Sequence, residues 1–136
     1  MIFGIDGGGT STRLVICSND GKILAQHCGK SSNIYSVGAD QAFTNIENLI
    51  KEACAFNKLS LSALQYGCIG SAGLQRKPEY EAFTTFFTKL LPQAKVRLCT
   101  DAEILLVGGL ASLEGYALIC GTGSIAMARN AQGELY

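Results

Sequence analysis

The residue run best suited to chemistry is a glycine-rich segment near the start of the chain. Residues 6–13 read Asp-Gly-Gly-Gly-Thr-Ser-Thr-Arg. Because glycine has no Cβ, such a run lets the backbone approach a phosphate closely, and its successive N–H groups can form an anion-binding concavity. Asp6 adds a carboxylate of the kind that Mg²⁺ uses beside phosphates. A tight hairpin needs only one or two glycines, so the sequence favours a phosphate site made of Gly7, Gly8, Gly9, Thr10 and Ser11.

A second glycine turn lies near the end of the chain and consists of Gly121, Thr122, Gly123 and Ser124. By the same argument, it could hold the other end of a polyphosphate from another strand pair of the same sheet. Two better-known phosphate motifs do not match. A dinucleotide fingerprint starting at Gly7 would need glycine at Thr12, and a P-loop ending at residues 29–31 would need glycine at Leu24.

Asp101 is the third candidate for chemistry, because it stands where a predicted strand ends and a helix begins. That edge is the usual ligand side of an α/β sheet. An acidic residue in a first helical turn is also favoured by the helix dipole alone. Spacing leaves these two interpretations of Asp101 equally open. Thr100 and Glu103 match a capping box, which explains Glu103 without any catalytic role.

The elements that must position these residues follow from hydrophobic periodicity and turn signals. Strands are expected at residues 2–5, 13–17 and 22–28, with a turn at Asn19-Asp20-Gly21 between the second and third. Helices are expected over residues 39–56, between Pro78 and Pro92, and from the capping box to about Val107. Further strands are expected at residues 65–69, 95–99, 116–120 and 124–128. This order predicts an α/β fold with a mixed sheet, three antiparallel N-terminal strands and flanking helices.

Apolar residues at helical spacing predict which faces of the two longer helices are buried. The first stripe comprises Ala39, Ala42, Phe43, Ile46, Leu49, Ile50 and Ala53. The second comprises Tyr80, Phe83, Phe87, Leu90 and Leu91. We expect both stripes to pack in the core.

The composition excludes several classes of protein. Of 136 residues, 48% are hydrophobic and 16% charged, which argues against disorder, and a formal net charge of zero argues against a nucleic-acid partner. No apolar run reaches the roughly 18–20 residues of a membrane span, and the N-terminus lacks a signal peptide, so we expect no membrane partner and a cytoplasmic location. The six cysteines include no CxxC pair and are expected to be small buried residues in a reducing compartment.

Five short segments together resemble N-acetylglucosamine kinases, within the wider group of BadF/BadG/BcrA/BcrD-type ATPases and the actin/hexokinase/Hsp70 superfamily. The segments are residues 5–10, 32–33, 70–73, 100–102 and 121–124. The resemblance implies a ribonuclease H-like, actin-like ATPase lobe over residues 1–136. It covers only the first of that family's two lobes, so we expect the second lobe to lie outside this chain.

The resemblance also implies roles for individual residues. Thr10 and Thr122 would contact the phosphates of ATP, and Asp6 would serve Mg²⁺. Asn33 would hold an amino sugar, with Ser71 near it. Asp101 would accept the proton of the sugar 6-hydroxyl as that oxygen attacks the γ-phosphate, which is the usual role of an aspartate in phosphoryl transfer.

The implied function is ATP-dependent phosphorylation of an amino sugar, most simply N-acetylglucosamine to its 6-phosphate, by the full-length protein. Two alternatives stay open at this point. One is an ATPase that activates a partner reductase, as in the sister branch of the family. The other is a non-catalytic, sugar-sensing lobe. The sequence also leaves a homodimer open.

Overall fold

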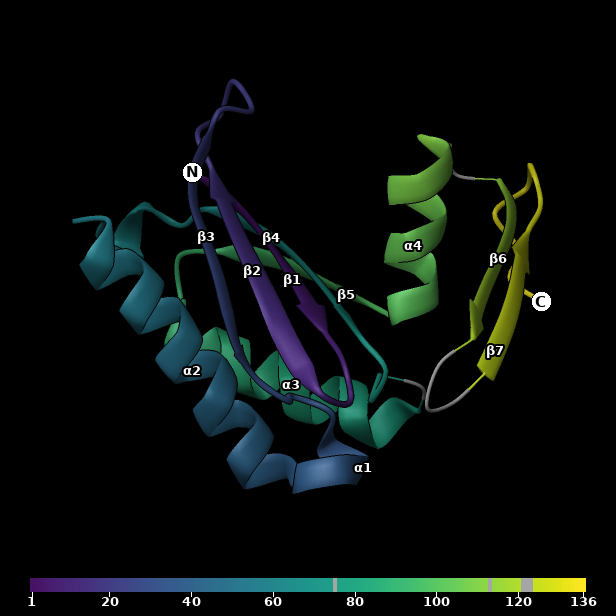
Figure 1. The fold of residues 1–136 in the computed structure, drawn as a ribbon, viewed down its shortest axis with the longest axis horizontal. Coiled ribbons are helices and arrows are strands. Elements are labelled where there is room, and N and C mark those ends of the chain that lie inside the picture. The colour runs from purple at the N-terminus through teal and green to yellow at the C-terminus, as the bar shows by residue number, and fades with distance from the viewer. Residues whose placement is uncertain (75, 113, 121–123) are drawn as a thin grey trace.

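The larger of the two sheets in the protein is mixed and has five strands (Figure 1). The structure is a computed structural model that describes residues 1–74, 76–112, 114–120 and 124–136. The strand order is β3-β2-β1-β4-β5. β1, β2 and β3 are antiparallel, and β4 and β5 run parallel to β1. Their bounds are β1 Ile2–Gly7, β2 Ser11–Cys17, β3 Ile23–Lys30, β4 Tyr66–Ser71 and β5 Lys95–Cys99. This confirms the predicted mixed sheet with three antiparallel N-terminal strands.

Successive side chains of a strand point to opposite faces of a sheet, so the two faces of this sheet pack against different helices. Phe3 and Ile5 of β1 point into the main core, where they meet α2 (Ala39–Phe56) and α3 (Lys77–Leu90). Figure 1 shows these two helices on one side of the sheet and α4 (Asp101–Leu110) on the other. Gly4 and Asp6 alternate with the core residues, so they belong to the face that looks toward α4.

The predicted helix stripes are confirmed except at their first residues. α2 buries Ala42, Asn45, Ile46, Leu49, Ile50, Ala53 and Cys54. Ala39 is exposed, because it is the first residue of the helix and lies beyond the sheet. In α3, Phe83 and Phe87 are buried, whereas Tyr80 is 49% exposed. The expectation that Tyr80 packs in the core was therefore wrong.

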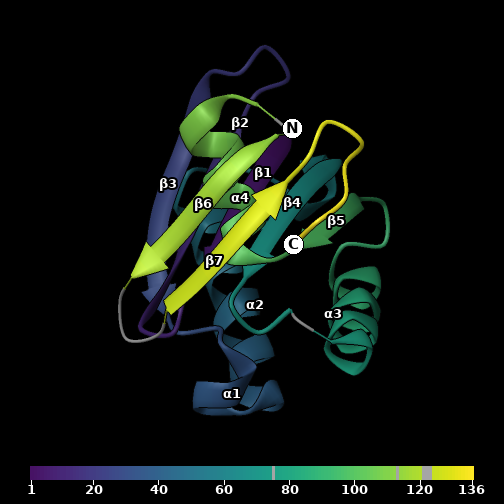
Figure 2. The ribbon, with the colours of Figure 1, turned by 90° about the vertical axis from the view of Figure 1, so that its right-hand side faces the viewer.

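The last two strands form a sheet of their own. β6 (Gly115–Cys120) and β7 (Ser124–Arg129) pair antiparallel and pack on α4, which lies between them and the large sheet in Figure 1. Figure 2 views the same arrangement with β6 and β7 in front. The interpretation that both glycine turns belong to one sheet was wrong. The hydrophobic pattern identifies each strand but does not specify which strands pair, so it could not place β6 and β7.

Two short elements were not predicted. α1 (Ile34–Val37) is a single turn between β3 and α2, and a 3₁₀ turn covers Leu61–Ala63. Segments of three or four residues are too short to show a helical periodicity in the sequence. Both elements are therefore recognised only from the hydrogen bonds of the structure. Asn33 caps α1 by accepting a hydrogen bond from the Tyr35 N–H at 2.9 Å.

The cysteines are less buried than expected. Only Cys54 and Cys99 are buried, whereas Cys28 and Cys120 are exposed and Cys17 and Cys68 are half-buried. All six are free thiols. Cys54 lies on α2, whereas the other five lie on strands, in which every second side chain points away from the core. Among the helices of the described residues, none has the length and apolar character needed to cross a membrane.

Candidate active site

The first glycine turn joins β1 to β2, as predicted. The Gly8 N–H donates to the Ser11 carbonyl at 3.0 Å, and Ser31 Oγ donates to the Gly8 carbonyl at 3.1 Å. Gly9 and Thr10 are exposed, while Gly8 and Ser11 are half-buried. The turn therefore presents the backbone of Gly9 and Thr10 to solvent, as a phosphate site requires.

Gly7 serves a different purpose from the other two glycines. It is buried, and a Cβ at this position would lie 2.6 Å from Ser32 Oγ and 3.1 Å from Ser71 Oγ. These distances are shorter than van der Waals contact. Glycine is therefore required at position 7 by packing beneath the turn, a reason that the sequence argument did not include.

A layer of hydroxyl groups supports the turn from below. Thr12 Oγ1 donates to Ser32 Oγ at 2.8 Å, and both side chains are fully buried. Ser71, at the end of β4, is also fully buried and accepts a hydrogen bond from the Gly73 N–H at 3.3 Å. The sequence analysis gave a role only to Ser71, although Thr12 lies in the glycine-rich run and Ser32 lies in one of the five segments of the resemblance. A buried hydroxyl beneath a loop has no sequence period, so the supporting role of Thr12 and Ser32 was not predicted.

Asn33 stands beside the turn. Its Oδ1 is occupied by the cap of α1, and its Nδ2 lies 3.9 Å from the position of a Cβ at Gly9. The segment that carries Asn33 is held by Ser31 on one side. On the other side, Tyr35 Oη donates to Glu79 Oε1 at 2.7 Å, at the start of α3. This hydrogen bond raises the pKa of Tyr35 and lowers the pKa of Glu79.

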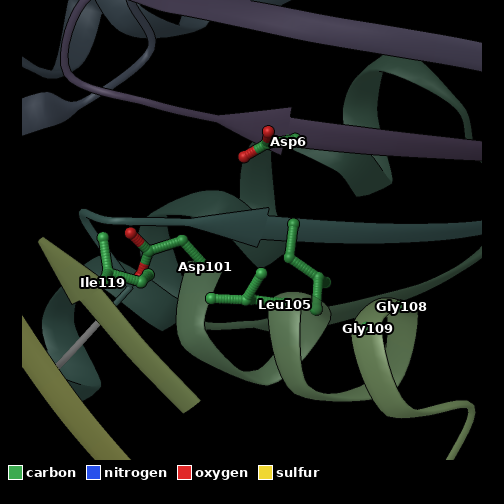
Figure 3. Close-up of a pocket in the computed structure, with 7 residues that line it drawn as sticks. Asp6, Asp101, Leu105, Gly108, Gly109 and Ile119 are labelled. Atoms are coloured by element: carbon green, nitrogen blue, oxygen red, sulfur yellow. The ribbon is translucent and has the colours of Figure 1, made fainter. Parts of the chain in front are cut away.

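A cleft of about 570 Å³ separates β1 from α4 and β6 (Figure 3). Asp6 borders it from β1, and Asp101 borders it from the first residue of α4. The rest of the described lining is apolar or glycine: Ile104, Leu105, Gly108, Gly109 and Ile119. The structure therefore brings together two predicted carboxylates that are 95 positions apart in the chain.

The two carboxylates differ in their local contacts. Asp101 Oδ1 accepts a hydrogen bond from the Ala102 N–H at 3.0 Å, and the capping box of Thr100 and Glu103 forms as predicted. Asp6 lies opposite Arg13 in the β1–β2 register, with an N···O distance of 3.6 Å. The two side chains are 45% and 73% exposed, so this ion pair contributes little to stability.

The remaining predicted site residues lie apart from this cleft or outside the described residues. Asn33 and Ser71 neighbour the first glycine turn and are not among the described lining residues. Gly121, Thr122 and Gly123 lie outside the described residues, so the second glycine turn stays a prediction. Ser124 is exposed at the start of β7, opposite Cys120 of β6.

Comparison with known proteins assigns the chain to an ATPase family. Residues 3–136 match the model of the BadF/BadG/BcrA/BcrD ATPase family, and the chain belongs to that family. It is 35% identical over 132 residues to an N-acetylmuramic acid/N-acetylglucosamine kinase of Clostridium acetobutylicum, covering 97% of this chain and 43% of that protein. It is 32% identical over 142 residues to an N-acetyl-D-glucosamine kinase of Dictyostelium discoideum, covering 98% and 44%.

Solved structures agree with this classification. A protein of Chromobacterium violaceum assigned as an N-acetylglucosamine kinase superposes with a TM-score of 0.80 at 26% identity, over 99% of this chain and 47% of that one. The chain thus spans less than half the length of the relatives that it matches. The actin-like kinase fold predicted from the resemblance is confirmed.

Proposed function

We propose that the full-length protein uses ATP to phosphorylate an amino sugar, most simply N-acetylglucosamine, at its 6-hydroxyl. The observation that carries this proposal is the position of Asp101, which borders the cleft opposite Asp6 at the N-terminus of α4. The proposal is supported by membership of an ATPase family and by relatives that are amino-sugar kinases.

In the proposed reaction, Asp101 accepts the proton of the sugar 6-hydroxyl as the oxygen attacks the γ-phosphorus of ATP. The bond between the γ-phosphorus and the β–γ bridging oxygen breaks, and ADP leaves. Phosphoryl transfer depends mostly on positioning and charge stabilisation, so a fixed carboxylate is the main chemical group that the protein must provide. The hydrogen bond from Ala102 and the capping box hold Asp101 for this role.

The phosphates of ATP would lie against the first glycine turn, with Thr10 and Ser11 donating hydroxyl hydrogen bonds beside Gly7, Gly8 and Gly9. The residues of the second turn, Gly121, Thr122, Gly123 and Ser124, would hold the opposite end of the triphosphate. Asn33 would hold the amino sugar through its Nδ2. Ser71 is buried beneath Gly7, so its proposed part is to shape the floor of this region.

Asp6 fits a magnesium ion that accompanies ATP. Mg²⁺ prefers one or two carboxylates together with substrate phosphates and water, and Asp6 borders the cleft, while Asp101 is the proton acceptor of the same proposal. The ion would neutralise charge on the phosphates. In the described residues, no cluster of three or more metal-ligating side chains occurs.

Further parts of the proposal concern the whole protein. Residues 1–136 would be the N-terminal actin-like lobe, and the remaining length seen in the relatives would form the second lobe. A kinase that consumes ATP and carries free cysteines suits the cytoplasm. A homodimer is a further expectation, which light scattering of the full-length protein would test.

The test is ADP release by the full-length protein with a panel of amino sugars, comparing wild type with Asp101→Asn. Loss of general-base catalysis is expected to lower kcat by about 10²–10⁴-fold. Glu103→Gln is the matched control, because glutamine also completes a capping box and should leave kcat near that of wild type. Full sugar-dependent turnover by Asp101→Asn would remove Asp101 from the mechanism. Sugar binding without phosphate transfer by wild type would favour a sensing role instead.

A further inference from the structure

Two thiols lie within contact distance on the cleft side of the large sheet. Cys68 is on β4, and Cys99 is the last residue of β5, with their Sγ atoms 3.7 Å apart. Gly70 lies opposite Cys99 in the parallel register, so Cys68 and Cys99 are diagonal neighbours on one face. This is the face that looks toward α4, because a Cβ at Gly70 would contact Ile104 of that helix. The pair therefore lies in the same layer as Asp6.

The surroundings give a small reagent access to one of the two thiols. Cys68 is half-buried, whereas Cys99 is 7% exposed. Gly4 lies opposite Cys68 in the β1–β4 register, and no atom lies within 4 Å of a Cβ built at Gly4. The missing side chain leaves open space beside Cys68, so Cys68 is the thiol that an incoming oxidant meets first.

We propose that Cys68 and Cys99 form a reversible disulfide, with a small-molecule disulfide such as oxidised glutathione as the oxidant. The Cys68 sulfur loses its proton and attacks one sulfur of the oxidant, which releases one thiol and leaves a mixed disulfide on Cys68. The Cys99 sulfur then attacks the Cys68 sulfur, loses its proton and releases the second thiol. Two protein thiols are oxidised and one small disulfide is reduced to two thiols, so atoms and electrons balance.

The environment of Cys99 makes it the second thiol to react. Burial, followed by the influence of Cys68, raises the pKa of Cys99 to about 12, so Cys99 is a neutral thiol at pH 7. Its Sγ also donates to the Ile69 carbonyl at 3.5 Å. Burial, the largest cause of the raised pKa, remains after Cys68 has reacted, so attack by Cys99 is the slower second step and depends on the short distance between the two sulfurs.

The bond would act on the candidate active site through the start of α4. A disulfide requires an S–S distance of about 2.05 Å and a Cα separation of about 4.4–6.8 Å. Diagonal neighbours on adjacent strands have Cα atoms about 7–8 Å apart, so the backbone of β5 must move together with the two sulfurs. Asp101 follows Cys99 by two residues, and Asp6, Gly70 and Cys99 are neighbours in one row across the sheet. A displacement of about 1 Å at a positioned catalytic group can lower the rate by about 10²-fold. This consequence rests on the proposed function, whereas the disulfide does not.

The disulfide is tested by peptide mapping of the full-length protein after incubation with oxidised glutathione. Trypsin places Cys68 in the peptide of residues 59–76, and places Cys99 with Cys120 in the peptide of residues 98–129. We expect these peptides to be joined, with the loss of two hydrogen atoms, and to separate after reduction. Cys120→Ser should retain the link and Cys99→Ala should lose it. A stable glutathione adduct on Cys68 with Cys99 still open to alkylation would overturn the proposal.

The effect on function is tested on the same samples. Oxidised wild type should show a 10- to 100-fold lower kcat for sugar-dependent ADP release, restored by dithiothreitol, whereas oxidised Cys68→Ser should keep its activity. A complete link with unchanged kcat would overturn the effect on the active site and leave the modification site standing. If reduced wild type phosphorylates no amino sugar, the proposed function fails, and the peptide map still decides whether the disulfide forms.

Discussion

At the scale of single residues, three consecutive glycines perform different tasks although they look alike in the sequence. Gly9 is exposed at the tip of the β1–β2 turn, where its backbone can face a ligand. Gly7 is buried against the hydroxyl groups of Ser32 and Ser71. The first task concerns binding and the second concerns packing, so substitutions at the two positions should have different consequences.

Gly7→Ala is expected to destabilise the protein by about 1–3 kcal/mol, because overpacking a filled interior displaces its neighbours. The added Cβ would lie 2.6 Å from Ser32 Oγ, so the buried Ser32 side chain must shift and its hydrogen bond from Thr12 is disturbed. Urea denaturation measures the change. Gly4→Ala is the matched control on the same strand, since no atom lies within 4 Å of its Cβ. Equal stability of the two variants would contradict the packing argument.

The two candidate carboxylates have different neighbours. Asp6 and Asp101 are both half-buried, but Asp101 is the first residue of α4, whereas Asp6 lies opposite Arg13. Both border the same cleft, although they are 95 positions apart in the chain.

At the scale of elements, α4 links the two sheets and carries Asp101. Its start is defined by the capping box, in which Thr100 Oγ1 accepts from the Glu103 N–H at 3.2 Å and Glu103 Oε2 accepts from the Thr100 N–H at 2.9 Å. Its end has Ala111 in a left-handed conformation, with φ of 50°. The local sequence therefore specifies where this helix begins more strongly than where it ends.

Thr100→Ala is expected to lower the free energy of unfolding by about 1 kcal/mol, because the N–H of Glu103 loses its acceptor. The stability is measured by urea denaturation, with Thr100→Ser as the control that retains a hydroxyl. We expect Thr100→Ser to remain within about 0.5 kcal/mol of wild type. A loss of the same size in both variants would mean that the threonine methyl group, and not the cap, stabilises this helix start.

At the scale of the whole molecule, two cores of unequal size stabilise the chain. The larger one lies between the five-stranded sheet and the helices α2 and α3, and includes Phe3, Ile50 and Phe83. The smaller one lies between α4 and the β6–β7 sheet and has four buried residues: Ala102, Leu106, Ala117 and Met127. The outer face of the small sheet leaves Tyr116 86% exposed and Leu118 66% exposed.

Because local stability follows buried apolar contact, the two parts of the chain should open with different free energies. We expect amide hydrogens of β1, β2 and β4 to exchange with solvent deuterium at least tenfold more slowly than those of β6 and β7. Hydrogen exchange of the 136-residue chain with mass-spectrometric detection measures this difference. Uniform protection across both sheets would show that the chain unfolds as one cooperative unit.

Local patterns were sufficient for most elements of this fold. The helical stripe of residues 39–56, Pro78 near the start of α3 and the capping box at Thr100 each depend on neighbours within one or two turns, and the structure confirms them. The glycine turn between β1 and β2 was identified for the same reason. Backbone and side-chain geometry over a few residues is enough to define such features.

Contacts between distant segments required the folded chain. The separation of β6 and β7 from the large sheet, the exposure of Tyr80 and the hydroxyl layer beneath Gly7 depend on which surfaces meet, and no local period encodes that choice. The approach of Cys68 to Cys99 and of Asp6 to Asp101 has the same origin. The local sequence determines the hydrophobic periodicity of each helix or strand. Which helices and strands pack together is determined by the burial of apolar surface over the entire chain, so it is seen only in the folded structure.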